Sequence, residues 1–452
     1  MGSYAIKKSY TFENGVQLRS ENGEIYTIMQ PLGRGGQGEV YKVQGADGVY
    51  ALKWYHKDCL DKIDAAAFRK NLQKNVKQGV PTLSKGDVAT QFIWPLQMIE
   101  PQAGSFGYLM DLFPAGYEPF KNVVMGMKKI PSTGQVIHLR WKSWFSVVTA
   151  GLNIVRAFEI LHSLGLSYQD INDGGIAVNM TNGDVFICDC DNVSPDRTNL
   201  GIRGMMTFMA PEVVRGEKLP DRYTDEFSLA IILFRLFMHG HPLEGEATRD
   251  IRNDPTISDK QSEMQIYGTN PRYCLSSVNN TNPASLKYNS DVLKFGLLYP
   301  KELLDAFEQV FTLGIRENNK RLTATEWRKI LLSVRDHLVL VNGYEAFFGK
   351  RYDKELPEGL RILKYKHGKE VYCMPDKILY SYHFNEFSND FKTPVGKIIP
   401  TARKDVLGLY NASPHVIKFS MEGKEGSCPP KGKMPIMKGM EVSIDRTQFT
   451  VI

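Results

Sequence analysis

Residues 168–193 constrain this chain more than any other stretch, because two short β runs there each have an aspartate beside them. The segment reads YQDINDGGIAVNMTNGDVFICDCDNV, with β-favouring residues at 175–180 and 185–190 around a turn at 181–183. Asp170 precedes the first run and Asp189 lies in the second, so a hairpin places both carboxylates at the same rim. One carboxylate there can orient a hydroxyl nucleophile while the other holds a metal ion on a phosphate. The pattern makes phosphoryl transfer the chemistry to test along the rest of the chain.

The composition is that of a large globular protein. A chain of 452 residues with 42% hydrophobic and 23% charged residues fits two or three domain-sized units. The net charge of +6 is spread thinly, so we expect no nucleic-acid partner. Six scattered cysteines show neither a disulfide framework nor zinc-site spacing, which favours a reduced, cytoplasmic compartment. Because the sequence shows no signal-peptide pattern and no bilayer-length apolar run, we also expect no membrane association.

A glycine-rich turn joins two predicted strands near the N-terminus. It has the pattern G-x-G-x-x-G-x-V, formed by Gly33, Gly35, Gly38 and Val40. Such a turn lets backbone N–H groups approach phosphate oxygens, because a Cβ would hold them off. The motif alone is weak, and a Rossmann fold would need a helix where the β-favouring EVYKV run follows.

Lys53 ends the next predicted strand, in YALK, after the small Ala51. A lysine at a strand end is usually a solvated cation, but after a glycine-rich hairpin its spacing fits a cation that pairs with α- and β-phosphates. Together the two features resemble the start of a protein kinase domain, G-x-G-x-x-G-x-V followed by V-A-I-K. The resemblance implies an ATP site on these residues.

Further motifs extend the resemblance over about residues 25–340. LHSLGLSYQD matches L-H-x-x-G-h-x-H-R-D and aligns Asp170 with the catalytic aspartate. M-A-P-E is intact and ends at Glu212, and the apolar helix that follows opens near Asp225, which in kinases caps the catalytic loop from below. Arg321, in NNKRLTATEW, is implied to form a buried ion pair with Glu212. The segment at 264–281 resembles a bacterial branch associated with tellurium-resistance and stress gene clusters.

The resemblance also assigns an adenine site and a helix partner for the lysine. In FGYLMDLF, Met110 resembles the gatekeeper, and the backbones of Asp111 and Phe113 are implied to face the adenine edge; a plain buried strand fits the same letters. Active kinases place a glutamate on the helix behind the lysine. The predicted helix at 65–76 has no acidic residue, and Asn71 occupies that position. We expect its amide oxygen to accept a hydrogen bond from Lys53, without the strength of a carboxylate.

The catalytic loop departs from the family pattern at two charged or metal-binding positions. Asn172 stands where kinases place a lysine that neutralises the γ-phosphate, and Gly175 stands where an asparagine holds the second metal. Asp189 aligns with the metal-binding aspartate; sliding the alignment by two puts Asp191 there instead. In the first alignment Asp191 offers a second carboxylate, so both aspartates are predicted ligands of Mg²⁺ or Mn²⁺.

Gln169 replaces the arginine that grips an activation-loop phosphate, so we expect no activation of that kind. Thr198 and Thr207 remain alternative phosphosites, with ordinary surface residues as the other interpretation. Met205 stands where Ser/Thr kinases place a threonine.

Two functions from different classes remain open. The first is an active Ser/Thr-type protein kinase that uses ATP with Lys53, Asp170 and Asp189, aided by Asn172. The second is a pseudokinase that acts as a nucleotide-binding or scaffold module. A small-molecule kinase is a remote third, because such enzymes do not normally keep M-A-P-E or the Asp225 helix. The resemblance implies a protein substrate, which the sequence does not name, and a cognate phosphatase encoded nearby.

We predict an α+β chain with a bilobal kinase-like fold and a small all-β domain. The predicted parts are a tail or lead-in strand (1–24), an N-lobe (25–113), a C-lobe (114–340), a helical connection and loop (341–360), and a β-sandwich or barrel (361–452). The last part faintly resembles a forkhead-associated domain but lacks its arginine-serine-histidine pattern. We expect it to dock a protein partner or to support oligomerisation.

Overall fold

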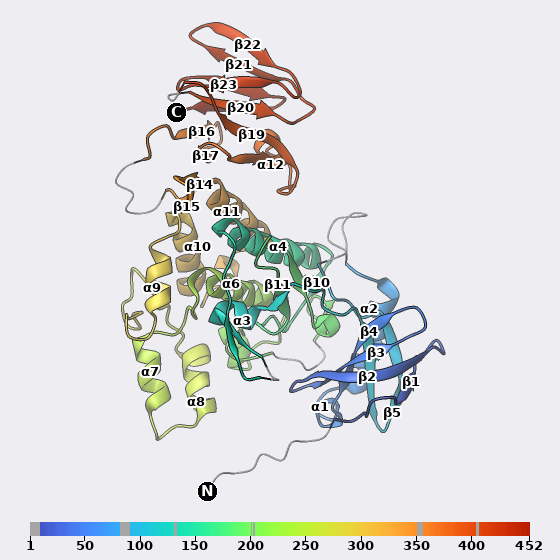
Figure 1. Cartoon of the computed structure of the whole chain (residues 1–452). Coiled ribbons are helices and arrows are strands. Elements are labelled where there is room, and N and C mark those ends of the chain that lie inside the picture. The colour runs from blue at the N-terminus through green and yellow to red at the C-terminus, as the bar shows by residue number, and fades with distance from the viewer. Residues whose placement is uncertain are drawn as a thin grey trace.

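The computed structural model describes residues 10–81, 91–130, 133–199, 201, 204–349, 356–403 and 406–452. Figure 1 shows an N-terminal sheet, a mostly helical middle part, and a C-terminal pair of sheets that sits beyond the end of α11 (Ala324–Asp336). The fold is α+β, as predicted.

The N-terminal part is one antiparallel six-stranded sheet in the order β1-β2-β3-β4-β6-β5. Its strands are β1 (Gln17–Arg19), β2 (Ile25–Arg34), β3 (Gly38–Gln44), β4 (Val49–Tyr55), β5 (Gln97–Gln102) and β6 (Ser105–Met110). After the short α1 (Lys57–Leu60), α2 (Ala65–Gln78) packs Phe68 and Leu72 against buried residues of β4, β5 and β6. The lead-in strand predicted within 1–24 is β1, which pairs with β2; residues 1–9 lie outside the described part.

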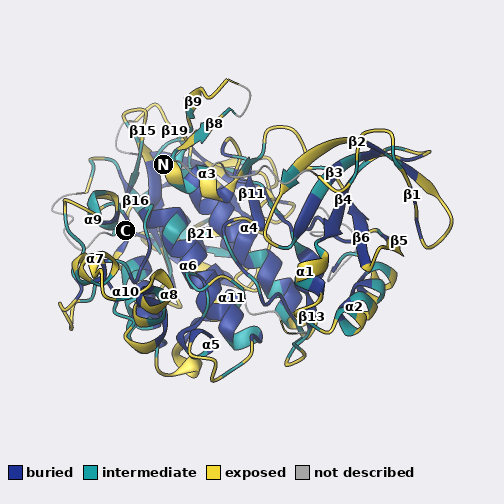
Figure 2. Ribbon diagram, turned by 90° about the horizontal axis from the view of Figure 1, so that it is seen from below, coloured by how far each residue is buried: buried dark blue, intermediate teal, exposed yellow. Residues whose placement is uncertain are grey.

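The middle part is built on two long apolar helices, α4 (Trp144–Ser163) and α6 (Arg222–Met238). Both are dark blue along most of their length in Figure 2, because they lie inside the core rather than on its surface. Ser143 caps α4, and Asp221 with Thr224 forms a capping box on α6, so the start of each helix is fixed by its own sequence. Among the described residues α4 alone is long and apolar enough to cross a membrane, and 78% of that stretch is buried inside the protein.

The other helices of the middle part surround α4 and α6. They are α3 (Phe120–Met125), α5 (Pro211–Val214), α7 (Glu246–Asn253), α8 (Asp259–Glu263), a π-helical turn (Met264–Thr269), α9 (Ser290–Gly296), α10 (Lys301–Thr312) and α11. Short 3-10 turns cover Cys190–Asn192 and Asn318–Lys320.

Three small sheets lie in and around the catalytic-loop region. The three-stranded sheet has the order β12-β11-β7, from β7 (Glu118–Pro119), β11 (Ile176–Val178) and β12 (Val185–Ile187). β10 (Leu166–Ser167) pairs with β13 (Ser194–Pro195), and β8 (Met127–Lys129) pairs with β9 (Val136–His138). The predicted hairpin is therefore present, with Ile176 opposite Ile187, but its strands are shorter than the β-favouring runs.

The connection after α11 is a β-hairpin, which corrects the helical connection predicted over 341–360. β14 (Leu338–Val341) pairs with β15 (Tyr344–Phe347) around Asn342 and Gly343, both with positive φ. An Asn-Gly pair adopts that backbone easily and turns two strands with the right twist, so the local turn chemistry decides the structure. Residues 350–355 of the predicted connection lie outside the described part.

The C-terminal part is a β-sandwich with two sheets, of order β17-β16-β25-β24-β21-β22 and β18-β19-β20-β23. Its elements are β16 (Arg361–Tyr365), β17 (Glu370–Cys373), β18 (Ile378–Tyr380), α12 (Ser381–Phe384), β19 (Pro394–Pro400), β20 (Leu407–Asn411), β21 (Ile417–Met421), β22 (Lys424–Cys428), β23 (Lys433–Ile436), β24 (Glu441–Ile444) and β25 (Thr447–Val451). Leu363, Ile398, Leu409 and Ile444 lie in one core between the two sheets.

Buried charges at the end of α11 join the sandwich to the helices. The Asp336 carboxylate accepts hydrogen bonds from His383 Nε2 at 2.7 Å and from the Tyr382 hydroxyl at 2.6 Å. Lys377 donates to the main-chain carbonyls of Arg335 and Asp336, at the C-terminal end of α11, and of Leu338, at the start of β14. Because these groups are buried together, the sandwich packs directly on the helical part.

Candidate active site

The backbone ahead of Asp170 is held by a buried aspartate from α6. Asp225 is 2% exposed, and its two carboxylate oxygens accept hydrogen bonds from the main-chain N–H groups of Tyr168 (2.7 Å) and Gln169 (2.9 Å). Gln169 has a φ of 71°, a conformation that non-glycine residues adopt at a cost. This is the capping contact that the resemblance implied for Asp225, and it fixes the point from which Asp170 projects.

Asp170 is braced by Asn172. The Asn172 amide donates to the Asp170 main-chain oxygen at 2.9 Å and to its carboxylate at 3.1 Å, while its own oxygen accepts from the Gly174 N–H. Burial raises the pKa of Asp170 to about 6, and the hydrogen bond from Asn172 opposes part of that rise. Asn172 therefore orients Asp170 but brings no positive charge to the site.

Lys53 meets two aspartates from the segment after β12. Its Nζ lies 2.7 Å from Asp191 Oδ2 and 3.2 Å from Asp189 Oδ1. Burial favours the neutral amine, but the two carboxylates outweigh it and raise the pKa of Lys53 above its ordinary range. Asp170 also interacts electrostatically with Asp191, Asp189 and Lys53, so the β4 lysine and the three aspartates share one site.

The two aspartates on Lys53 differ in exposure. The Asp189 side chain is 45% exposed and its φ is 50°, whereas the Asp191 side chain is fully buried. Asp191 Oδ2 also accepts a hydrogen bond from the Tyr55 hydroxyl, and Asp191 Oδ1 has no hydrogen-bond partner among the described residues. The Asp189 side chain is thus accessible, and its role as a metal ligand stays a prediction. The Asp191 side chain is enclosed and one of its oxygens is held by Lys53 and Tyr55, so its role as a second metal ligand stays a prediction.

Asn71 has a different partner from the one predicted. Its amide donates to the Val193 main-chain oxygen at 2.8 Å, and the Asn75 amide donates to the same oxygen at 2.8 Å. The expected contact from Lys53 to Asn71 is replaced by the pair with the two aspartates, since a carboxylate attracts an ammonium group more strongly than an amide does. We call residues 188–192, which contain Asp189 and Asp191, the metal loop; α2 is therefore attached to Val193, directly after this loop, rather than to the lysine.

The glycine-rich hairpin has two kinds of glycine. A Cβ on Gly38 would lie 2.3 Å from the Trp54 oxygen, so Gly38 is required by the close approach of β4. A Cβ on Gly33 would meet no atom within 4 Å, and one on Gly35 only the Gly38 oxygen at 3.9 Å. The space on the side where a Cβ would lie is therefore open at both positions, while the Gly35 N–H donates to the Gly38 oxygen at 2.8 Å.

The predicted adenine wall lies beside that hairpin. Ala51 pairs directly with Met110 between β4 and β6, and both side chains are buried, with Val40 packed against the same cluster. Asp111 and Phe113 follow β6 and are exposed, the latter by 53%. An apolar wall followed by an exposed main-chain segment fits a flat aromatic base.

The ion pair predicted between Glu212 and Arg321 is present. Arg321 donates to both carboxylate oxygens, at 2.7 and 2.8 Å, and its Nε donates to the Gly314 oxygen. The Arg321 side chain is only 1% exposed. The pair joins α5 to the segment before α11, so its position is structural rather than in the cleft.

Gln169 organises the segment that follows the metal loop, a role that sequence reasoning missed. Its Nε2 donates to the hydroxyls of Ser167 and Ser194 and to the Thr198 oxygen, while its Oε1 accepts from Asn199. These neutral hydrogen bonds connect the catalytic loop to residues 194–199. The arginine-to-glutamine change was the available signal, but its meaning depends on hydroxyls that only the fold brings near.

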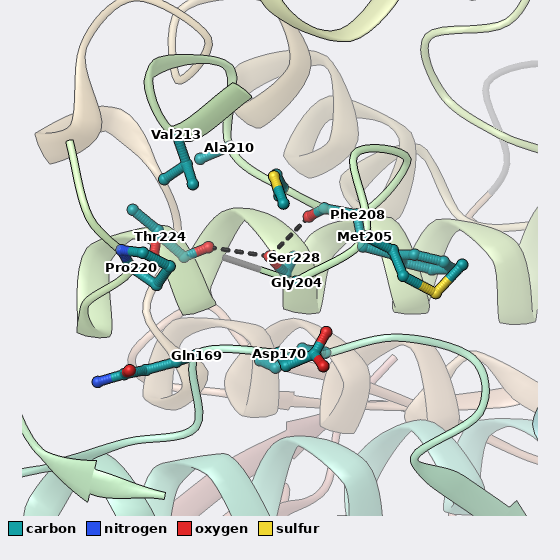
Figure 3. A pocket seen from close by; sticks show the side chains of 12 residues that line it. Gln169, Asp170, Gly204, Met205, Phe208, Ala210, Val213, Pro220, Thr224 and Ser228 are labelled. Carbon is teal, nitrogen blue, oxygen red and sulfur yellow. Dashed lines mark hydrogen bonds between the residues drawn. The ribbon is translucent and has the colours of Figure 1, made fainter. Parts of the chain in front are cut away.

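A small cavity of about 10 Å³ separates the catalytic loop from the segment at 204–213. Figure 3 shows Gln169 and Asp170 on one side, and Met205, Phe208 and Val213 opposite them. A Cβ on Gly204 would lie 2.9 Å from Asp170 Oδ1, so this segment passes close to the carboxylate.

Tyr168 and Gly175 form a coupled pair that motif alignment did not reveal. The Tyr168 hydroxyl donates to the Cys188 oxygen, and a Cβ on Gly175 would lie only 2.8 Å from that hydroxyl. Tyr168 is 1% exposed and cannot move aside freely. The tyrosine therefore fills the place beside residue 175 and leaves room for glycine only.

Residues 135–329 match the family model of the protein kinase domain. Over these residues the chain is similar to protein kinase domains. The matched residues include α4, the catalytic-loop region and α6, while the six-stranded sheet that carries Lys53 lies outside them.

Several curated kinases are similar to this chain at low identity. Serine/threonine-protein kinase SCH9 of Candida albicans is 23% identical over 289 residues, covering 62% of this chain and 34% of that protein. Protein kinase YegI of Escherichia coli is 23% identical over 339 residues, covering 72% and 47%. Beta-adrenergic receptor kinase 1 of Mesocricetus auratus is 26% identical over 233 residues, covering 50% and 30%. The chain thus spans less than half the length of these relatives.

Among solved structures, the Mycobacterium tuberculosis PknI kinase domain aligns with a TM-score of 0.43 and 15% identity, covering 71% of this chain and 98% of that one.

Proposed function

We propose that this chain is an ATP-dependent Ser/Thr-type protein kinase that transfers the γ-phosphoryl group to a protein hydroxyl. The observation that carries the proposal is the shared site of Lys53, Asp170 and Asp189. Lys53 lies on β4, Asp170 in the catalytic loop and Asp189 in the metal loop. Lys53 and Asp189 are 136 residues apart along the chain.

In this proposal Asp170 orients the acceptor hydroxyl and takes its proton. A pKa of about 6 leaves the carboxylate ionised at neutral pH and close to the range where a general base works best. Asn172 keeps the carboxylate aimed, and Asp225 keeps its backbone in place. Because transfer depends mainly on position, these two supports matter as much as the base itself.

ATP supplies the phosphoryl group when bound, and the residues present fit it. Ala51 and Met110 provide an apolar wall for the base, and no side chain at Gly33 or Gly35 blocks the approach of phosphates to the hairpin. Lys53 provides the positive charge beside them. Its buried position makes that charge more effective than a solvated lysine would be.

Mg²⁺ or Mn²⁺ neutralises phosphate charge when bound, and Asp189 would hold it. The Asp189 side chain is partly exposed, and only its Oδ1 contacts Lys53, so Oδ2 remains open to a hard cation. The structure offers no side-chain ligand at Gly175, and Asn172 is engaged with Asp170. We therefore expect a site dominated by one metal ion and slower transfer than in kinases with the full set.

The second candidate is a pseudokinase, favoured by the replacement of both a lysine and an asparagine at positions 172 and 175. In that case the same cleft would bind nucleotide without transfer.

The partners belong to this proposal as well. We infer a protein substrate, a cognate phosphatase and a bacterial stress-related branch from the family resemblance; the similar curated kinases include one of E. coli beside fungal and mammalian kinases of similar identity. The β-sandwich, packed on α11, is proposed as the docking part for a protein partner in the cytoplasm.

Transfer from γ-labelled ATP tests the proposal. Wild-type protein with Mg²⁺ or Mn²⁺ is expected to label itself or a protein mixture, and Asp170→Ala and Asp189→Ala are each expected to abolish labelling. Nucleotide binding with no transfer under either metal would select the pseudokinase instead.

A further inference from the structure

The helix behind Lys53 offers it no carboxylate. α2 reads AAAFRKNLQKNVKQ, and its two inward amides, Asn71 and Asn75, both donate to the Val193 oxygen. A buried ammonium group without an anionic partner is costly, because it loses its hydration. The charge of Lys53 must therefore be compensated from another element.

Asp191 has the position and burial to do this. Its Oδ2 lies 2.7 Å from Lys53 Nζ, and it has no exposed side-chain surface. Tyr55 lies two residues after Lys53 on β4, so both side chains point to one face of the strand, and the Tyr55 hydroxyl donates to the same oxygen. Asp191 is thus held by two groups of β4 while its backbone belongs to the helical part.

We propose that Asp191 is the positioning residue of Lys53 and supplies, from the metal loop, the carboxylate that α2 lacks. The inference rests on the proposed function, in which Lys53 binds nucleotide phosphates. Asp189 is the weaker partner, with a longer contact of 3.2 Å and a half-exposed side chain that remains open to a metal ion.

This arrangement changes what sets the lysine in place. Lys53 is tied across the cleft to residue 191, and α2 is tied to residue 193 of the same segment. One short segment therefore aligns the lysine, the metal-binding Asp189 and α2 together. No swing of α2 is needed to bring a carboxylate to the lysine.

The first test separates a lysine-positioning role from a metal-ligand role. Binding of a non-hydrolysable ATP analogue is measured by titration calorimetry, with EDTA and then with Mg²⁺, for wild type, Asp191→Asn and the matched Asp189→Asn. Asp191→Asn is expected to weaken binding by about ten- to a hundredfold in both conditions, since a charge-assisted contact is lost. Asp189→Asn is expected to weaken binding chiefly with Mg²⁺. An Asp191→Asn effect that appears only with Mg²⁺, or no effect, would overturn the proposal.

The second test does not depend on nucleotide binding or on kinase activity. Melting temperatures are measured for Lys53→Met, Asp191→Asn and the double variant, with the same cycle for Asp189→Asn as control. If Asp191 holds Lys53, the double variant melts no lower than the less stable single variant. Additive shifts in the Asp191 cycle would overturn the proposal. Wild type that binds no nucleotide would refute the proposed function, and this cycle would still decide the pairing of Lys53 with Asp191.

Discussion

Removing the Glu212 carboxylate tests how strongly the buried ion pair holds the helical part together. Arg321 donates two hydrogen bonds to Glu212, one to the Gly314 oxygen and one to the Tyr223 oxygen, with its side chain 1% exposed. In Glu212→Ala the two donors that faced the carboxylate lose their partner in a buried place. Breaking one side of such a pair costs about 3–5 kcal/mol. For a domain of this size that corresponds to a fall in melting temperature of roughly 6–20 °C.

The assay is thermal unfolding of the full chain, followed by circular dichroism. Glu217→Ala is the matched control, because Glu217 pairs with Arg215 nearby but is 57% exposed, and we expect it to leave the melting temperature unchanged. Combining Glu212→Ala with Arg321→Met should lower stability by less than the sum of the two single changes. A Glu212→Ala protein that melts like wild type would refute the reasoning.

Three further perturbations follow from the site and from the junction with the sandwich. Gly175→Asn, which introduces the residue usual in kinases, is expected to destabilise the protein by about 1–3 kcal/mol, because the new side chain would contact the Tyr168 hydroxyl. Adding Tyr168→His should recover most of this loss, as measured by urea unfolding. Equal stability of wild type and Gly175→Asn would contradict the prediction. The rate of phosphoryl transfer should fall as pH drops below about 6, because Asp170 must be ionised to act as a base. Initial rates measured over pH 5–8 test this, and a rate that does not change with pH would count against Asp170 as the base. The raised pKa of Asp170 also means that its contribution to the free energy of unfolding weakens as pH rises from about 4 to about 6. Asp336→Asn removes the charge that His383 contacts at 2.7 Å where the sandwich meets α11. We expect the sandwich to detach from α11 with its own core still folded, so that limited proteolysis cleaves the chain more readily. An unchanged cleavage pattern would show that these charges do not hold the sandwich against α11.

Several contacts that the motifs imply are present, because each motif carries its own backbone requirement. Gly38 must be glycine for β4 to approach, and Asp225 must be buried at the start of α6 to cap the loop. Such requirements are local or involve one fixed partner. A single sequence therefore contains enough information to predict that Lys53, Asp170 and Asp189 lie near one another.

The partners within the cleft were harder to predict than its members. The alignment predicts that Asn71 contacts Lys53 and that Asp191 binds a metal ion. In the structure the Asn71 amide donates to the Val193 main-chain oxygen, and the buried Asp191 carboxylate contacts Lys53. Which of several polar groups reaches a buried lysine depends on the relative placement of β4, α2 and the metal loop. Spacing along the chain does not specify that placement, so a substitution at one motif position can be compensated from another.

The hairpin at 338–347 shows a different kind of miss. The predicted helical connection and loop is wrong here, because an apolar, β-favouring LVLV run, an Asn-Gly pair and YEAF form a hairpin. The positive φ of Asn342 and Gly343 is what the turn requires. Here the information was present in the sequence, and turn chemistry should have outweighed the neighbouring helical period.

The most direct test of the central claim is mass-spectrometric detection of new phosphoserine or phosphothreonine after incubation with ATP and Mg²⁺ or Mn²⁺, comparing wild type with Asp170→Asn. Asparagine keeps the shape of the side chain but cannot take a proton, so folding and nucleotide binding should be retained. The account predicts phosphorylated residues with wild type and none above background with Asp170→Asn. Equal phosphorylation in both samples, or none with wild type that still binds ATP, would contradict it.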